Sequence, residues 1–120
     1  MPIVTLTNVS KTYPSRSQGD REIVAVDDVT LSIDKGDVFG IIGYSGAGKS
    51  TLVRLINALE PATHGTITVD GVDITALKES ELRAVRGGIG MIFQQFNLFG
   101  SRTIYDNVAY PLKLARWKKV

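Results

Sequence analysis

The sequence predicts a mixed α/β fold in which an antiparallel β-sheet is attached to a core of strand, glycine-rich loop and helix. Two β-type segments open the chain, at residues 3–9 and 23–33, and the second shows the alternation of a half-buried strand. A glycine-rich loop at residues 43–50 then lies between an apolar segment and an amphipathic one. Further along, Asp70-Gly71 separates two short β-type segments, which is a strong signal for a two-residue hairpin turn.

The composition is that of a globular protein and excludes several other classes. With 120 residues, 43% hydrophobic and 22% charged, the chain forms one domain at most. The net charge of +2 is small and its basic residues are dispersed, so no nucleic acid is expected as a partner. No apolar run approaches the length of about 18 residues that crosses a membrane. The chain has no cysteine, which excludes disulfides and thiolate metal sites.

The segments on either side of the glycine-rich loop differ in their apolar spacing. Residues 38–42 are nearly all apolar, which is expected of a strand covered on both faces. After the loop, apolar residues recur at the spacing of one helical face. This spacing predicts a helix whose inner side is formed by Leu52, Leu55, Ile56 and Leu59, and which Pro61 ends.

Turn-forming residues divide the rest of the first two thirds of the chain. The polar residues 13–20 predict a loop between the first two strands. Residues 66–69 and 72–74 are the expected strands of the hairpin. His64, which lies just before them in a turn-rich stretch, is expected to be an exposed loop residue.

The last third predicts two helices separated by a strand. Residues 79–86 have the pattern of a short helix, which the glycines at 87–88 terminate. Residues 89–93 are apolar enough for another strand. Thr103-Ile104-Tyr105-Asp106 has the spacing of a capping box that opens a last helix. Pro111 is expected to kink or divide that helix.

The glycine-rich loop is a complete phosphate-binding P-loop, Gly43-Tyr44-Ser45-Gly46-Ala47-Gly48-Lys49-Ser50. Its glycines let the backbone approach closely, so that its N–H groups and the start of the next helix surround a phosphate chain. The pattern assigns Lys49 to the β- and γ-phosphates, the Ser50 hydroxyl to Mg²⁺, and Thr51 to a further phosphate hydrogen bond. A chance glycine turn matches the four constrained positions in roughly one sequence of this length in a few hundred.

The residues around the P-loop resemble the ATP-binding cassette (ABC) family. Tyr13 lies thirty residues before Gly43 and follows Val9-Ser10-Lys11-Thr12, as does the family's aromatic residue that stacks on adenine. Residues 89–94, Ile-Gly-Met-Ile-Phe-Gln, resemble its Q-loop. The resemblance gives Gln94 contact with Mg²⁺ and the attacking water, with Gln95 as the neighbour that can be confused with it. The alternatives are an edge aromatic residue for Tyr13 and a local loop amide for Gln94.

The resemblance to the ABC family covers nearly all 120 residues, and the residues toward their end resemble one subfamily in particular. The runs at residues 89–98 and 107–112, with Ser101-Arg102-Thr103 between them, resemble the ATPase subunits of bacterial methionine importers. This implies ATP and Mg²⁺ as cofactors, ATP hydrolysis coupled to transport, and a place at the cytoplasmic side of the bacterial membrane. It also implies a second ATPase subunit and a membrane permease, which the region after Gln94 contacts. Three apolar residues near that contact can instead form a local core cluster, namely Phe96, Leu98 and Phe99.

Several motifs of the family have no counterpart in this sequence. These are the signature motif and its helical subdomain, the Walker B strand with its aspartate and glutamate, the D-loop and the switch histidine. Residues 1–120 are therefore expected to be the N-terminal part of a nucleotide-binding domain with a P-loop NTPase core, either a fragment or the product of a truncated gene. Alone, such a chain is expected to bind nucleotide weakly, to hydrolyse little or none, and to self-associate through unpaired apolar edges.

Two other functions remain open from the sequence. One is a soluble ABC-type ATPase that works in DNA repair or translation without a permease. The other is a non-catalytic nucleotide-binding or association piece whose P-loop is vestigial. Interaction with a permease distinguishes the first from an importer subunit, and nucleotide binding distinguishes the second.

Overall fold

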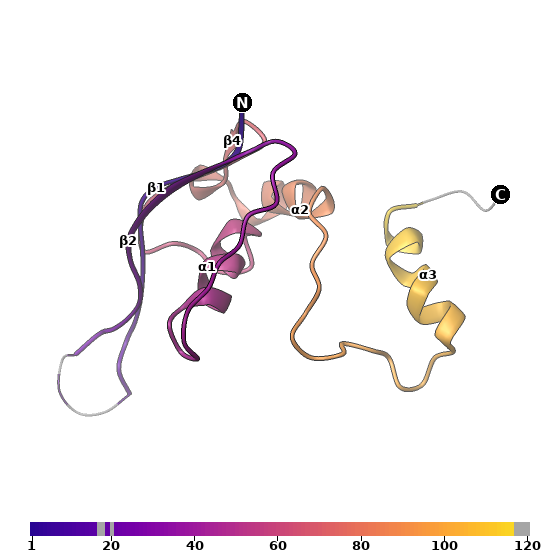
Figure 1. Ribbon diagram of the computed structural model, residues 1–120. Coiled ribbons are helices and arrows are strands. Elements are labelled where there is room, and N and C mark those ends of the chain that lie inside the picture. Colours follow the sequence, from indigo (N-terminus) through magenta and orange to yellow (C-terminus); the bar gives the residue numbers. More distant parts are fainter. Residues whose placement is uncertain (17–18, 20, 117–120) are drawn as a thin grey trace. The chain divides into compact units, whose positions relative to one another are not determined.

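A computed structural model describes residues 1–16, 19 and 21–116, which belong to two compact units (Figure 1). The first unit is Met1–Gly88 and the second is Ile89–Val120. Of the three α-helices among the described residues, the first unit holds two, together with the β-sheet, and the second holds the last. None of the helices described is long and apolar enough to cross a membrane.

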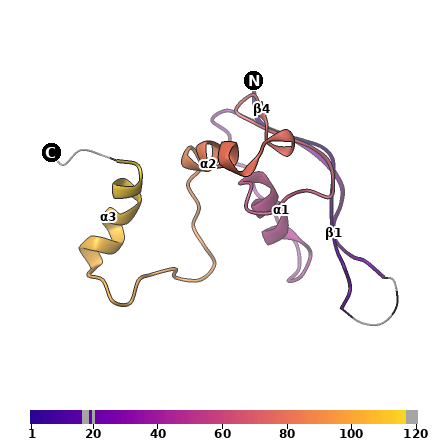
Figure 2. The same cartoon turned by 180° about the vertical axis from the view of Figure 1, so that it is seen from behind.

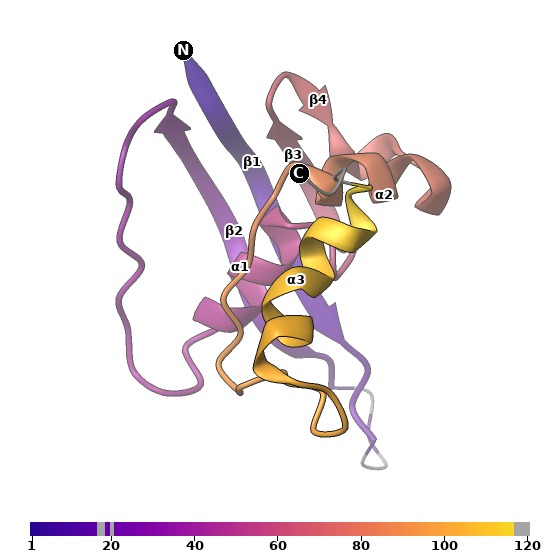
Figure 3. The ribbon, with the colours of Figure 1, turned by 90° about the vertical axis from the view of Figure 1, so that its right-hand side faces the viewer.

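The first unit is built on an antiparallel sheet with the strand order β2-β1-β3-β4 (Figure 3). Its strands are β1 (Pro2–Tyr13), β2 (Ile23–Asp34), β3 (His64–Val69) and β4 (Val72–Asp73). The expected antiparallel sheet is thus confirmed, and β1, β2 and β3 are longer than the apolar pattern indicates. His64 is exposed, as expected, but it is the first residue of β3 rather than part of a loop. Between β1 and β2, residues 14–16 form no strand, and residues 17, 18 and 20 of the expected loop lie outside the described residues.

An irregularity in β1 changes which of its residues face the core. Leu6 pairs with Leu31 and Val9 with Val29, so β1 has one residue more than β2 in this interval. Asn8 lies there with φ of 49°, and its side-chain amide donates to Asp28 across the sheet at 2.9 Å. Such a bulge reverses the alternation of a strand. As a result Leu6 and Val9, which are both fully buried, lie on the same side although their spacing is odd.

The core of the first unit lies between the sheet and α1 (Lys49–Ile56). The helix has two buried leucines, Leu52 and Leu55, and contacts β2 and β3. Figure 1 shows the helix on one side of the sheet. The sheet and the turn after β4 supply the other large buried side chains, which are Leu6, Val9, Val26, Ile67, Val69 and Ile74.

The helix α1 ends at Ile56, three residues before the predicted position of its last apolar contact. Asn57 follows, and its side-chain oxygen accepts from the N–H of Leu59 at 3.2 Å. Ala58 then takes a left-handed conformation with φ of 60°, which no residue of a continuing helix adopts. The expectation that Leu59 lies on the inner helical face is therefore wrong, and its side chain is 46% exposed.

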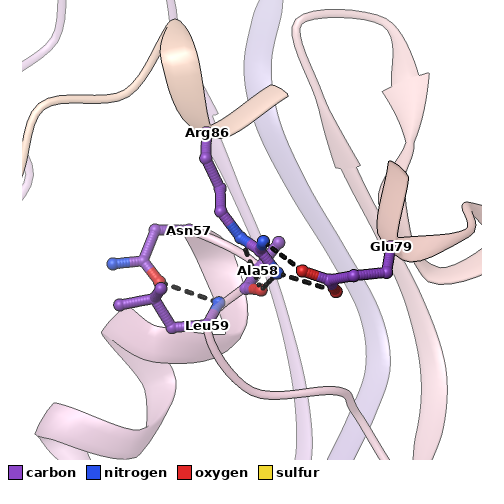
Figure 4. A network of polar contacts seen from close by, with 5 residues as sticks. All are labelled: Asn57, Ala58, Leu59, Glu79 and Arg86. Carbon is purple, nitrogen blue, oxygen red and sulfur yellow. Dashed lines mark hydrogen bonds and ion pairs between the residues drawn. The ribbon is translucent and has the colours of Figure 1, made fainter. Parts of the chain in front are cut away.

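A guanidinium group holds the end of α1 against a second helix (Figure 4). Arg86 donates to the Ala58 carbonyl oxygen from Nε at 3.1 Å and from Nη2 at 2.7 Å. The same guanidinium forms a bidentate pair with Glu79, at 2.6 and 3.2 Å. This pairing lowers the pKa of Glu79 below its usual value, chiefly through the hydrogen bond from Arg86.

The hairpin and the second helix agree with their predictions (Figure 2). Asp70 and Gly71 both have positive φ, 48° and 79°, as a tight hairpin turn between β3 and β4 requires. A 3₁₀ helix, η1 (Ile74–Ala76), follows at once, so β4 stops one residue short of the predicted range. The helix α2 (Glu79–Gly87) then begins and ends within a residue of its prediction.

Two predicted strands do not form. Residues 38–42 and 89–93 have no regular secondary structure, although both segments are apolar. The side chains of Val38, Ile42 and Ile92 are almost completely exposed, at 102%, 96% and 99%. A strand needs a neighbour that completes its backbone hydrogen bonds, and no described strand pairs with either segment.

In the second unit, a loop is fastened to α3 (Ile104–Leu114). The Thr103 hydroxyl oxygen accepts from the N–H of Asp106 at 3.0 Å, which confirms the predicted cap. Asn107 bonds both backbone groups of Phe99, accepting from its N–H at 2.9 Å and donating to its carbonyl at 3.2 Å. Pro111 lies within the helix and does not divide it, so that part of the expectation is wrong.

Candidate nucleotide-binding site

The predicted P-loop lies in the first unit, as an exposed loop that leads directly into α1. Gly46 and Gly48 adopt φ of 81° and 95°, a region that residues with a Cβ rarely enter. The N–H of Ala47 donates to the carbonyl of Tyr44 at 3.0 Å, which closes a turn inside the loop. The Tyr44 side chain is 93% exposed and is not held by the fold.

One glycine of the loop, Gly48, is required by close packing as well as by conformation, and a second, Gly43, lies in a tight contact. At Gly48 a Cβ would overlap the carbonyl oxygen of Ala25 in β2, so the end of the loop lies directly against the sheet backbone. At Gly43 a Cβ would stand 3.2 Å from the Cβ of Ala47, on the opposite arm of the loop. At Gly46 a Cβ would meet nothing within 4 Å, so this glycine is needed for its φ alone.

The first turn of α1 is open to an anion. Gly48 is the N-cap residue and supplies no side-chain acceptor, and the first turn has no acidic residue. The carbonyl of Gly48 accepts from the N–H of Leu52 at 2.9 Å, so the helix is regular from its start. An uncapped helix N-terminus presents N–H donors and a partial positive charge.

The ammonium group of Lys49 folds back over the loop. Its Nζ donates to the carbonyl oxygens of Gly43 and Tyr44, at 2.7 Å each. An ammonium group has three donors, so these two contacts leave one for a further acceptor. Ser50 is exposed and Thr51 half-buried in the same helical turn. The structure thus places Lys49, Ser50 and Thr51 together where the loop joins α1.

A hollow of about 420 Å³ adjoins the loop. Its walls come from β2, from residues 41–42 and from the start of α1, with Val24, Val26, Ala47 and Lys49 among them. The loop, the helix start and this hollow form a continuous concave region of the first unit.

Tyr13 is the last residue of β1, paired with Ile23 of β2, and its side chain is half-buried. The ammonium of Lys11 lies over its ring, 5.0 Å from the centroid. The sequence pattern did not single out Lys11. Lys11 lies in a part of β1 whose residues are polar, and the bulge at Asn8 turns its side chain toward the core.

Gln94 lies in the second unit and is exposed there. The segment after it borders a groove of about 720 Å³ against α3, whose lining includes Phe93, Phe99, Tyr110 and Leu114. Phe99 packs edge-to-face on Tyr110, with ring centroids 4.8 Å apart.

The alternative of a local apolar cluster beside this groove is only partly realised. Phe96 and Leu98 are 94% and 70% exposed, while Phe99 is 43% exposed. The guanidinium of Arg102 covers the rings of Phe99 and Tyr110, at 5.0 and 5.5 Å. A local core therefore accounts for Phe99 but not for Phe96 or Leu98.

Known proteins that resemble this chain are ABC proteins. The sequence profile of the family described as ABC transporter matches residues 26–120. Curated relatives include the methionine import ATP-binding protein MetN of Bifidobacterium longum, 62% identical over 118 residues, and MetN 2 of Rhodococcus jostii, also 62% identical over 118 residues. Each alignment covers 98% of this chain but only 29% and 34% of the relative, so the chain spans about a third of their length.

Solved structures of ABC cassettes have the same fold. A dimeric ATP-binding cassette in a post-hydrolysis state, bound to ADP and Pi, superposes with a TM-score of 0.87 at 37% identity. The superposition covers 98% of this chain and 50% of that one. A second dimeric structure, described as a bacterial ABC transporter cassette, gives a TM-score of 0.86 at 36% identity.

Proposed function

This chain belongs to the ABC transporter family, and on that premise we propose that it carries the P-loop part of the ATP site of an importer ATPase subunit. The observation that carries the proposal is the geometry at the start of α1. A helix start without a capping side chain lies beside a loop with two positive-φ glycines and the ammonium of Lys49. Such an array of N–H donors and positive charge fits a phosphate chain.

We propose methionine as the transported substrate and the cytoplasmic face of the bacterial membrane as the location. The support is the identity of 59–62% with proteins named for methionine import in three organisms. Residues 1–120 are the N-terminal part of a nucleotide-binding domain in this proposal. The whole subunit would be an ATP hydrolase, whereas the 120 residues alone bind nucleotide and turn over little or none, because they hold no counterpart of the family's Walker B aspartate and glutamate or of its switch histidine.

Each predicted residue has a role in the proposed site. The backbone of residues 43–48 surrounds the β-phosphate, Lys49 neutralises the terminal phosphates, and Thr51 donates a hydrogen bond. Tyr13 receives the adenine ring on its face. The exposed hydroxyl of Ser50 fits Mg²⁺, because hydroxyl oxygens are ligands that this ion accepts. For Gln94, in the second unit, the proposed contact with Mg²⁺ and with the attacking water rests on the family resemblance and on its exposed amide. When bound, the metal ion neutralises charge on the phosphates.

The proposed partners are a membrane permease and a second ATPase subunit. The groove between residues 91–99 and α3 is concave and largely apolar, and Phe96 and Leu98 stand exposed beside it, which supports a protein contact at this place. The two dimeric cassettes with the same fold support a second ATPase subunit.

Calorimetric titration with ATP and Mg²⁺ tests the nucleotide site. We expect millimolar or tighter binding to the wild-type chain and at least about tenfold weaker binding to Lys49→Ala, since a charge-assisted phosphate contact is lost. Lys35→Ala is the matched control, because Lys35 is an exposed lysine in the turn after β2. No heat at millimolar ATP for the wild type would contradict the proposal and favour a vestigial P-loop.

A further inference from the structure

Lys11 has a charged side chain in a buried position, where a charge raises the free energy of the folded chain. Its side chain is almost wholly buried, with 8% of the residue exposed. An ammonium group withdrawn from water must be paired with acceptors or with other charge. Its partners in the fold are the carbonyl oxygen of Pro61 at 2.7 Å and the carboxylate of Glu60 at 3.6 Å. The third is the ring of Tyr13.

The arrangement of Lys11 and Tyr13 follows from the backbone of β1. The two residues are separated by one position, so they lie on the same side of the strand. The bulge at Asn8 makes this the side on which Leu6 and Val9 are buried. The ammonium then stands 5.0 Å from the ring centroid, within the range of a cation–π contact. One face of the Tyr13 ring is therefore occupied, and only the other can receive a ligand.

Lys11 also connects Tyr13 to the helix of the P-loop. Its two oxygen acceptors, on Glu60 and Pro61, lie in the segment just after α1. The first residues of α1 form the proposed phosphate site. A single ammonium group thus holds the aromatic ring in a fixed relation to the element that carries the phosphate donors.

We propose that Lys11 is a positioning residue for the nucleotide base. It fills one face of Tyr13 and fastens the ring to the segment after α1, so that the free face is held ready for a purine before nucleotide arrives. This inference rests on the proposed function, because it assumes that Tyr13 receives the base. It assigns to Lys11 no contact with the nucleotide itself.

A comparison of two ligands separates the base from the phosphates. ATP has both, whereas inorganic tripolyphosphate has only the phosphate chain. For Lys11→Met, we expect affinity for ATP with Mg²⁺ to fall by about three- to tenfold, the effect of losing a cation–π contact that orders the ring. Affinity for tripolyphosphate should change by less than about twofold. Lys11→Arg keeps a cation over the ring and should restore most of the ATP affinity.

Four further variants complete the test. Tyr13→Leu should weaken the binding of ATP but not that of tripolyphosphate. Adding Lys11→Met to Tyr13→Leu should have no further effect, because the two residues act through one contact. Glu60→Gln should reproduce part of the Lys11→Met effect. Lys35→Met, which removes an exposed lysine, should change neither ligand.

Each failure has a different meaning. If Lys11→Met weakens both ligands equally, Lys11 supports only the fold and the inference is overturned. If it weakens neither while Tyr13→Leu weakens ATP, the inference is overturned and the proposed site stands. If Tyr13→Leu also leaves ATP affinity unchanged, Tyr13 does not hold the base, and the proposed role of Tyr13 falls with the inference. Far-UV circular dichroism of every variant checks that it is folded.

Discussion

The two segments that flank the P-loop are both apolar, yet only one of them is buried. After the loop, α1 buries Leu52 and Leu55 to 8% and 0% exposure. Before it, Val38 and Ile42 are exposed to 102% and 96% in a segment without regular structure. A helix completes its backbone hydrogen bonds within itself, whereas a strand depends on a neighbour. The apolar pattern predicts which side chains favour burial, but a partner strand decides whether it happens.

Residues 89–93 of the second unit behave in the same way: the segment is apolar but forms no strand, and Ile92 is 99% exposed. By contrast, β1 and β2 pair with each other along nearly their whole length, from Pro2 and Asp34 to Tyr13 and Ile23. Four changes test how far this contrast between partnered and unpartnered segments holds.

The largest effect is expected from shortening a buried leucine. Leu55→Ala should lower the free energy of unfolding by about 3 kcal/mol, because it removes buried methyl groups and leaves a cavity in the core. Ile42→Ala should change it by less than about 0.5 kcal/mol, as is usual at the surface. Urea unfolding followed by circular dichroism measures both. Equal losses would mean that Ile42 is buried in solution and that the contrast is wrong.

A somewhat smaller effect is expected where the loop meets the sheet. Gly48→Ala should cost about 2 kcal/mol or more, because the new methyl group would overlap the Ala25 carbonyl and also strain a positive φ. Gly46→Ala should cost only about 1 kcal/mol, since its φ is strained but the space around it is open. The two unfolding midpoints in urea give the difference. Equal losses would show that the contact with β2 is absent in solution.

A third change acts on association rather than on folding. Exposed apolar side chains in the unpaired segments should make the chain self-associate, so Ile42→Lys should shift the population toward monomer. Stability should change by less than about 0.5 kcal/mol. Sedimentation velocity measures the shift, with Ser80→Lys as a control that adds the same charge at an exposed position of α2. A wild-type chain that is monomeric at high concentration would contradict the expectation.

The smallest effect is expected at the surface pair of Glu79 and Arg86. The pKa of Glu79 lies below its usual 4.5 in the folded chain, so the pair stabilises the fold above that pH. The contribution is lost as the pH falls through the lowered pKa and the carboxylate gains a proton. Glu79→Gln should therefore reduce stability at pH 7 and make no difference in strong acid.

The measurement for this last change is a pair of urea titrations, one at pH 7 and one well below pH 4.5. Glu22→Gln serves as a control because it removes an exposed carboxylate elsewhere in the first unit. A deficit of Glu79→Gln that persists at low pH would mean that the pair acts through packing and not through charge.

Local signals in the sequence located most elements of the fold. The Asp70-Gly71 turn and the Thr103 cap each depend on residues a few positions apart, and both formed as predicted. The apolar spacing did not show the early end of α1, because that spacing continues to Leu59 while the chain turns at Ala58, whose carbonyl accepts from Arg86, 28 residues further on. The unpaired segments were mispredicted for a related reason, since strand formation requires a partner that the apolar pattern alone does not supply.

The geometry of the candidate site could be predicted to a similar degree. The P-loop is contiguous, and its glycines, Lys49 and the helix start lie where their spacing places them. The placement of Lys11 beside Tyr13 could not be predicted, because it depends on which side of β1 each residue faces, and the bulge at Asn8 reverses those sides. A strand with regular alternation would turn Lys11 to the opposite side from Leu6.

The hydrogen bonds from Arg86 to the Ala58 carbonyl have a consequence for how the first unit unfolds locally. The Ala58 carbonyl, in the left-handed turn just after α1, accepts hydrogen bonds from a side chain of another helix. Detaching α2 would leave that carbonyl without its two donors and would loosen the last turn of α1. Amide hydrogens at the end of α1 and throughout α2 should therefore exchange with solvent together, as one cooperative opening.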